Sequence, residues 1–244
     1  MPSVWTCLYV EYRKHARSLA LLLAVVAPLL IAVFVFFNLV CDHRPISWDM
    51  TMATAAAIWA YFMLPMSVTA LTALVAQAEH GPRAWDQLHA LPLPRARLYA
   101  AKALWVLIVV ALMSAAVGVA SWLAVHAASA WRPDAAPTGR FDAVHYLGLI
   151  TRIYLSAWLL VAVQTWIALR FHSFVPALAA GIGGTFFAVV ASSARVGVVL
   201  PWQIPVNMLA SDPARMHLAL GVGLIGGVAV MALMVRQLAR REVI

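Results

Sequence analysis

The sequence predicts an all-α membrane protein with six transmembrane helices. Of its 244 residues, 64% are hydrophobic and 11% are charged, whereas soluble proteins are about half apolar and a quarter charged. The charged residues are clustered and leave six uncharged intervals of 17 to 29 residues, at 18–41, 50–78, 103–131, 153–169, 171–194 and 216–235. A helix needs about 20 apolar residues to cross the hydrocarbon core of a bilayer. We therefore treat 1–244 as a single transmembrane domain.

The distribution of lysine and arginine predicts the orientation. Six crossings place both termini on one side, and if that side is the cytosol, the cytosolic segments hold 11 Lys/Arg and the outer segments hold 6. Cytosolic loops carry the excess of these residues, so we expect both termini in the cytosol. The formal charge of +8 is scattered over segment ends and forms no stripe that could follow a nucleic-acid backbone. We expect membrane lipids with anionic headgroups, and no nucleic acid, as its partners.

The elements are expected in the following order. Residues 1–16 carry Val4, Trp5, Leu8 and Tyr12 at helical spacing, which is typical of an interfacial helix lying on the membrane. The spans follow at about 18–41, 51–78, 103–130, 147–170, 173–194 and 216–236. A loop at 79–102 separates spans two and three, and a proline-interrupted segment at 195–213 separates spans five and six.

The loop at 79–102 is the most informative stretch of the sequence. Gly81-Pro82 ends one helix, and Leu91-Pro92-Leu93-Pro94 ends another, which leaves a short helix of about two turns between them. Trp85 and Leu88 lie three residues apart and share one face of that helix. Such a helix suits either a membrane interface or the groove of a partner protein.

The loop resembles that of the type-2 ABC transporter permeases, and the matching residues are Glu79, Gly81, Trp85, Leu88, Pro92, Arg95, Tyr99 and Lys102. The chain is most similar to the small six-span permeases of bacteriocin and lantibiotic self-protection exporters. The resemblance implies a coupling helix that sits in a separate cytosolic ATP-binding cassette ATPase, with Arg83 and Asp86 at its rim. For Arg95 and Lys102, the alternative is that they anchor lipid headgroups at the mouth of the third span.

The same resemblance implies the assembly and its cargo. A second permease copy or a sister permease would complete the pathway in the bacterial cytoplasmic (inner) membrane. The complex would export an amphipathic or apolar molecule, such as an antimicrobial peptide.

Two stretches are candidates for the transport pathway and its outer gate. In the second span, Pro65 predicts a kink, and Ser67 and Thr69 follow it as either a polar patch or part of a packed bend. The apolar but proline-broken stretch 195–213 fits a re-entrant or interfacial pair of helices, and the resemblance implies re-entrant ones. The residues of that stretch proposed for the gate are Pro201, Trp202, Pro205 and Asn207.

The motifs that the sequence lacks limit its chemistry. There is no G-x-x-x-x-G-K-[ST] phosphate loop, so ATP and Mg²⁺ are expected in a partner subunit and no cofactor is expected in this chain. The eight histidines and two cysteines have no metal-binding spacing. We therefore expect a chain that is not itself an enzyme. The alternative is a membrane-embedded enzyme or lipid-modifying factor that uses His43, Asp49, Asp142 and His145 at the outer surface.

Overall fold

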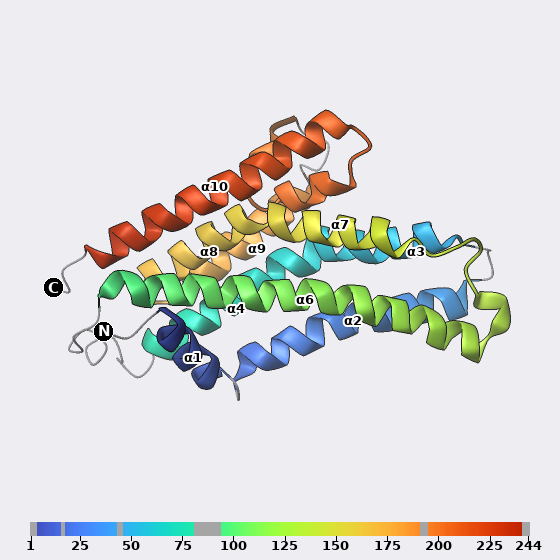
Figure 1. Ribbon diagram of the computed structural model, residues 1–244, viewed down its shortest axis with the longest axis horizontal. Coiled ribbons are helices and arrows are strands. Elements are labelled where there is room, and N and C mark those ends of the chain that lie inside the picture. The colour runs from blue at the N-terminus through green and yellow to red at the C-terminus, as the bar shows by residue number, and fades with distance from the viewer. Residues whose placement is uncertain (1–3, 16–17, 43–45, 81–93, 191–194, 241–244) are drawn as a thin grey trace.

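The computed structural model describes residues 4–15, 18–42, 46–80, 94–190 and 195–240, which form an elongated bundle of helices (Figure 1). Helix α1 (Val4–His15) and the last turn of α10 (Pro213–Ala239) lie at the same end of this bundle. We call this the terminal end and the opposite one the distal end. The end of α4 (Leu64–His80) and the beginning of α6 (Arg95–Trp131) also lie at the terminal end.

Five helical stretches of the described residues are long and apolar enough to cross a membrane. They are α2 (Leu19–Cys41), the continuous run Trp48–Glu79, α6, the run Ala143–Arg170, and α10. Helix α9 (Val175–Val190) has 16 residues, or about 24 Å at 1.5 Å per residue, which is less than the roughly 30 Å of a bilayer core. The fifth span predicted at 173–194 continues into residues outside the described ranges.

The second of these stretches, Trp48–Glu79, contains a π-helical turn instead of the simple kink that the sequence predicts at Pro65. Helix α3 (Trp48–Ile58) passes into the π-helix η1 (Trp59–Met63), which continues as α4. The N–H of Leu64 bonds to the carbonyl of Trp59, five residues back. Because Pro65 has no N–H to donate, the regular ladder is already interrupted at this position, and a π turn accommodates the break. The Trp59 indole then reaches Ser114 on α6, with 3.3 Å between Nε1 and Oγ.

Helix α6 has 37 residues, about 55 Å in length, and packs along α2. Its length carries it beyond the roughly 30 Å hydrocarbon core. The first turns of α6, which hold Arg95, Tyr99 and Lys102, lie at the terminal end beside α1. This arrangement brings charged residues from distant parts of the chain together.

The fourth stretch bends at Ala157, between α7 (Ala143–Ser156) and α8 (Trp158–Arg170). Gly223 and Gly227 of α10 face this bend, where a Cβ atom would collide with the backbone of Ser156 and Trp158. Small residues of this kind allow two helix backbones to approach closely. The GxxxG pattern of α10 is therefore used for packing within the chain.

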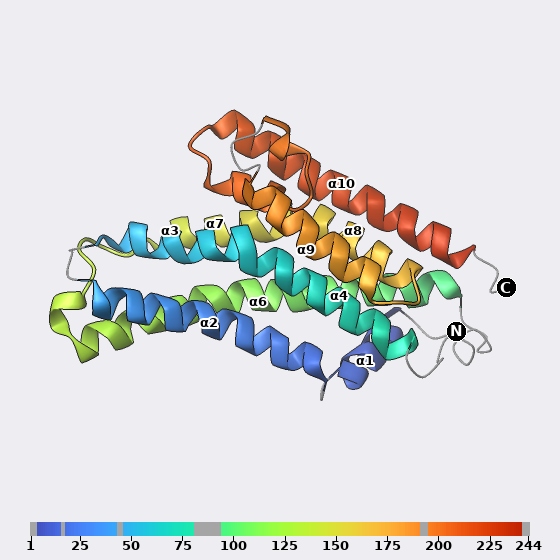
Figure 2. The same ribbon diagram turned by 180° about the vertical axis from the view of Figure 1, so that it is seen from behind.

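Short helical turns between α9 and α10 lie on the distal half of the bundle. These are η3 (Arg195–Val198) and η4 (Ile204–Leu209), with turns between them. Pro205 is buried in η4, and Asp212 caps α10 by accepting a hydrogen bond from the N–H of Ala214. Figure 2 shows these turns folded against the bundle beside α9 and α10.

Candidate functional site

Four charged residues gather at the terminal end of the bundle. Glu11 and Lys14 lie one turn apart on α1, Glu79 lies in the last turn of α4, and Lys102 lies in the third turn of α6. We call these four residues the ion cluster. Glu79 comes two residues before the stretch 81–93, for which the sequence predicts a coupling helix and which lies outside the described residues.

The ion cluster is a closed set of short contacts. The Lys102 ammonium donates to Glu79 Oε1 at 2.7 Å and to Glu11 Oε1 at 2.9 Å. Lys14 donates to the same Oε1 atom of Glu79 at 2.7 Å and lies 3.5 Å from Glu11 Oε1. Two carboxylates and two ammoniums thus balance each other, and they link three helices.

Burial makes these contacts energetically important. Lys102 and Glu79 are each 1% exposed, and Glu11 is 4% exposed. Moving a charge out of water costs several kcal/mol, which its partners must offset. Removing one partner from a buried ion pair typically costs about 3–5 kcal/mol, because an uncompensated charge remains. The ion cluster therefore couples the positions of α1, α4 and α6 strongly.

Lys14 is the least buried member, with a side chain 32% exposed. Burial by itself would lower the pKa of its ammonium. The hydrogen bond to Glu79, together with the negative charges of Glu11 and Glu79, outweighs burial and raises the pKa above the usual 10.5. Lys14 is therefore charged throughout the physiological pH range.

Aromatic residues cover one side of the ion cluster. His15 is 3% exposed and stacks on Trp105 of α6, with ring centroids 6.0 Å apart. Tyr12 meets the same indole edge-on at 5.9 Å. The Nδ1 atom of His15 lies 2.9 Å from the Glu11 carbonyl and 3.9 Å from Glu11 Oε2. This packing excludes water and orients α1 across the beginning of α6.

The structure places only some of the predicted coupling residues. Glu79, Arg95, Tyr99 and Lys102 lie together at the terminal end, and Tyr99 is 7% exposed in a small cluster with Ala76 and Ala103. The predicted residues Arg83, Trp85, Asp86, Leu88 and Pro92 lie outside the described residues. Headgroup anchoring, the alternative for Lys102, is wrong, because its ammonium is buried between two carboxylates.

Sequence reasoning did not identify Glu11, Lys14 or His15 as site residues. The signal was present, since Glu11 is the single acidic residue in an otherwise basic and apolar N-terminal segment. A lone carboxylate within an apolar helix often indicates a buried partner. The identity of that partner, however, depends on tertiary packing.

The pathway candidates of the second span form a packed polar joint. Thr69 is 1% exposed and Ser67 is 3% exposed. The Gln164 amide of α8 donates to Thr69 Oγ1 at 2.9 Å and to the Ala177 carbonyl of α9 at 3.2 Å. A Cβ atom at Gly181 would collide with Thr69 and Gln164, whereas one at Gly183 would meet nothing within 4 Å. In this single chain, the joint connects α4, α8 and α9.

The gate candidates form a second network at the distal end. Asn207 is 3% exposed and donates to the carbonyls of Gly197 at 3.0 Å and Gln203 at 2.9 Å. Its own Oδ1 accepts from Arg215 Nε of α10 at 2.7 Å. Trp202 packs against Gly184 of α9, where a Cβ atom would collide with the indole. Asn207 thus joins η3, η4 and α10 into one cap.

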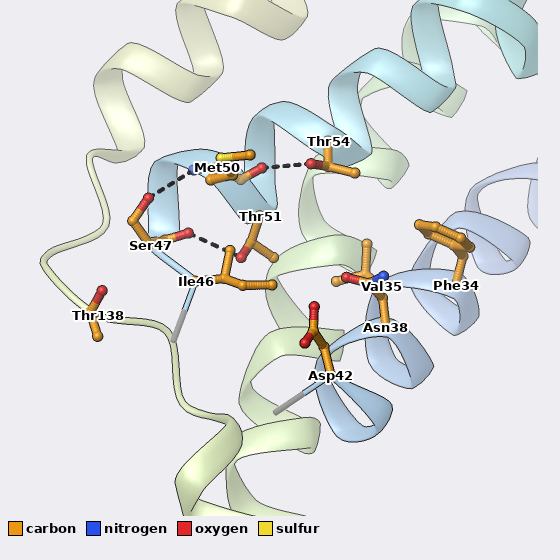
Figure 3. Close-up of a pocket in the computed structure, with 10 residues that line it drawn as sticks. All are labelled: Phe34, Val35, Asn38, Asp42, Ile46, Ser47, Met50, Thr51, Thr54 and Thr138. Atoms are coloured by element: carbon orange, nitrogen blue, oxygen red, sulfur yellow. Dashed lines mark hydrogen bonds between the residues drawn. The ribbon is translucent and has the colours of Figure 1, made fainter. Parts of the chain in front are cut away.

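A cavity of about 600 Å³ opens at the same end of the bundle, between the end of α2 and the beginning of α3. Figure 3 shows Asn38 of α2, and Asp42 just after this helix, facing Ile46 and Thr51. In its wall, the hydroxyls of Thr51 and Thr54 donate to the backbone carbonyls four residues earlier. Mixed polar and apolar walls suit an amphipathic molecule.

The residues of the alternative enzymatic site have structural roles where they are described. Asp142 caps α7 by accepting from the N–H of His145 at 2.9 Å, and Asp49 lies in the first turn of α3, where a carboxylate is favourable. His43 lies outside the described residues. Within the part of the chain that the structure describes, no group of three or more His, Cys, Asp or Glu residues could hold a metal ion.

A comparison with known families finds a match over most of the chain. A family model described as "ABC-2 family transporter protein" matches residues 7–192. The matched region includes all four residues of the ion cluster and the whole stretch between α4 and α6. No curated protein matches the chain.

Proposed function

The chain belongs to the ABC-2 family of transporters, and from this premise we propose that it is the permease subunit of an exporter driven by a separate ATP-binding cassette ATPase. The family match carries the proposal. The absence of a phosphate-loop motif in the sequence supports placing ATP and Mg²⁺ in the partner. The chain itself then serves as a non-catalytic pathway component.

The ion cluster supports a mechanism of coupling. The stretch 81–93, where we place the coupling helix, connects to α4 just after Glu79 and to α6 shortly before Lys102. Movement of an ATPase groove that holds Trp85 and Leu88 would pull on both connections at once. Because Glu79 and Lys102 bind each other and also bind residues of α1, the three helices would then move as a unit.

The topology that we propose has six spans, with the fifth at about 173–194 as the sequence predicts. The terminal end faces the cytosol, as the 11-to-6 distribution of Lys/Arg favours. In this orientation the ion cluster lies at the cytosolic interface, where an ATPase would bind, and the Asn207 cap lies at the outer mouth. Helix α1 lies along the cytosolic leaflet with Trp5 exposed to lipid headgroups.

We further propose that two permeases, identical or related, enclose the pathway. Spans one and two line the cavity at the distal end, which would be a site of release for an amphipathic or apolar molecule. An antimicrobial peptide is the cargo that the resemblance favours. The cytoplasmic membrane of a bacterium is the expected location.

Co-purification tests the central proposal. The chain is produced together with an ATP-binding cassette ATPase from the same genome, and recovery of the ATPase is measured for wild type and for Trp85→Ala. Truncating an aromatic anchor at an interface commonly costs about 2 kcal/mol or more, so we expect at least a tenfold loss of association. Trp131→Ala is the matched control, because Trp131 is 78% exposed at the distal end of α6.

Two outcomes would contradict the proposal. Equal recovery and equal stimulated ATP hydrolysis for wild type and Trp85→Ala would remove the coupling role from the loop. Recovery of no ATPase with the wild-type chain, under conditions where both proteins are well produced, would remove the ATPase as partner.

A further inference from the structure

An apolar groove of about 750 Å³ runs along the outside of the bundle at the terminal end, between α6 and α10. Its α6 wall includes Ala96, Ala100 and Ala103, whose small side chains leave room for another molecule, and continues along Leu104 and Leu107. Val228 and Val235 of α10 form part of the opposite wall. The two helices converge at this end of the bundle (Figures 1 and 2).

Two arginines stand at one end of this groove. Arg236 and Arg240 lie four residues apart, so they share a face of α10, and both line the groove and are exposed. Neither forms an ion pair with a carboxylate of the described residues. A guanidinium presents a planar fork of N–H donors that matches the oxygens of a phosphate. The end of an apolar groove therefore carries two phosphate-binding groups.

The dimensions of the groove match one leaflet of a bilayer. From Val228 to Arg240 the chain advances 12 residues, or about 18 Å along a helix, and half of a hydrocarbon core is roughly 15 Å. Helix α10 is also the least buried of the five long stretches, because the rest of the chain buries only 22% of its most apolar 18 residues. Most of its surface is therefore left uncovered by the rest of the described chain.

We propose that this groove binds one anionic phospholipid, with an acyl chain between α6 and α10 and its phosphate on Arg236 and Arg240. The lipid belongs to the leaflet at the terminal end. Its acyl chain fills the space that the alanines of α6 leave empty, and its headgroup neutralises two adjacent positive charges. The inference requires only that the chain lies in a bilayer, so it stands apart from the proposed export function.

Native mass spectrometry of the purified chain tests this site. Phosphatidylglycerol and phosphatidylcholine are titrated separately, and the fraction carrying one bound lipid is measured. We expect a preference for phosphatidylglycerol. An arginine near an anionic lipid contributes about a fivefold gain in binding, so Arg236→Gln with Arg240→Gln should weaken phosphatidylglycerol binding roughly 25-fold. Arg13→Gln, an exposed arginine of α1 at the same end, should leave it unchanged.

A second variant tests the acyl-chain position without altering charge. Ala232 is an exposed groove residue of α10, and Ala232→Trp should fill the groove and reduce phosphatidylglycerol binding at least tenfold while both arginines remain. Unchanged binding by this variant would overturn the groove as the site. Equal binding of the two lipids, or equal effects of the Arg13 and Arg236/Arg240 changes, would overturn specific headgroup recognition. A dimer that Ala232→Trp dissociates would make a second copy the occupant and overturn the lipid.

Discussion

Replacing Lys102 by methionine tests the ion cluster most directly. Methionine keeps most of the volume of the side chain and removes its charge, so Glu11 and Glu79 both lose a buried ammonium that lies within 2.9 Å of each. Lys14 remains 2.7 Å from Glu79 and 3.5 Å from Glu11, so compensation is partly retained. We therefore expect a loss near the lower end of the 3–5 kcal/mol range for a broken buried pair, about 3 kcal/mol.

The assay is thermal unfolding of the purified chain in detergent micelles. For a chain of 150–250 residues, 1 kcal/mol shifts the midpoint by about 2–4 °C, so Lys102→Met should lower it by roughly 6–12 °C. The control is Arg13→Met, because Arg13 is an exposed residue of α1 outside the ion cluster. An exposed substitution of this kind usually changes stability by no more than about 0.5 kcal/mol.

A double variant separates charge balance from packing. Lys102→Met combined with Glu79→Gln removes one charge of each sign and leaves Glu11 beside Lys14. It should melt above Lys102→Met alone, since coupled residues show interaction energies of about 0.5–3 kcal/mol. Two results would show that the contacts of Lys102 do not hold the three helices together. One is a melting midpoint of Lys102→Met equal to that of Arg13→Met. The other is simple additivity of the effects of Lys102→Met and Glu79→Gln in the double variant.

Three further predictions concern other parts of the molecule. Because the pKa of Lys14 is raised in the folded chain, its contribution to stability is fully present below 10.5 and is lost as the pH rises through the higher folded value. Above pH 10.5, the melting midpoint of wild type should therefore fall more steeply with pH than the midpoint of Lys14→Arg. Parallel curves of midpoint against pH would refute this. Gly181→Ala should destabilise the joint between α4, α8 and α9 by about 1–3 kcal/mol, whereas Gly183→Ala should be nearly neutral in the same melt; equal midpoints would show that the joint yields easily. In intact cells an impermeant maleimide should label exposed Cys41 at the distal end and spare buried Cys7, and labelling of Cys41 only after permeabilisation would reverse the proposed orientation.

The residues of the loop at 79–102 are sufficient to indicate the family from the sequence alone. Glu79 and Lys102 each match a residue type found in that loop of type-2 ABC permeases, and the family match over 7–192 confirms the assignment to an ABC-2 permease. The sequence pattern does not show that the two residues bind each other. It also does not include Glu11 and Lys14, which complete the ion cluster. Glu11 is 91 residues from Lys102 in the sequence, and Lys14 is 65 residues from Glu79.

The sequence by itself determined that the chain is a helical membrane protein, and five of its six predicted spans coincide with helical stretches long enough to cross a membrane. Those properties follow from the summed hydrophobicity of contiguous residues and from the need to satisfy backbone hydrogen bonds within lipid, and both are local along the chain. Only the tertiary structure decided that Lys102 is buried instead of anchoring headgroups, that Thr69 and Gln164 form a joint between helices, and that α6 and α10 leave a groove between them. Each of these depends on which helix faces meet, and that is set by close packing among residues far apart in the sequence, which no single segment encodes.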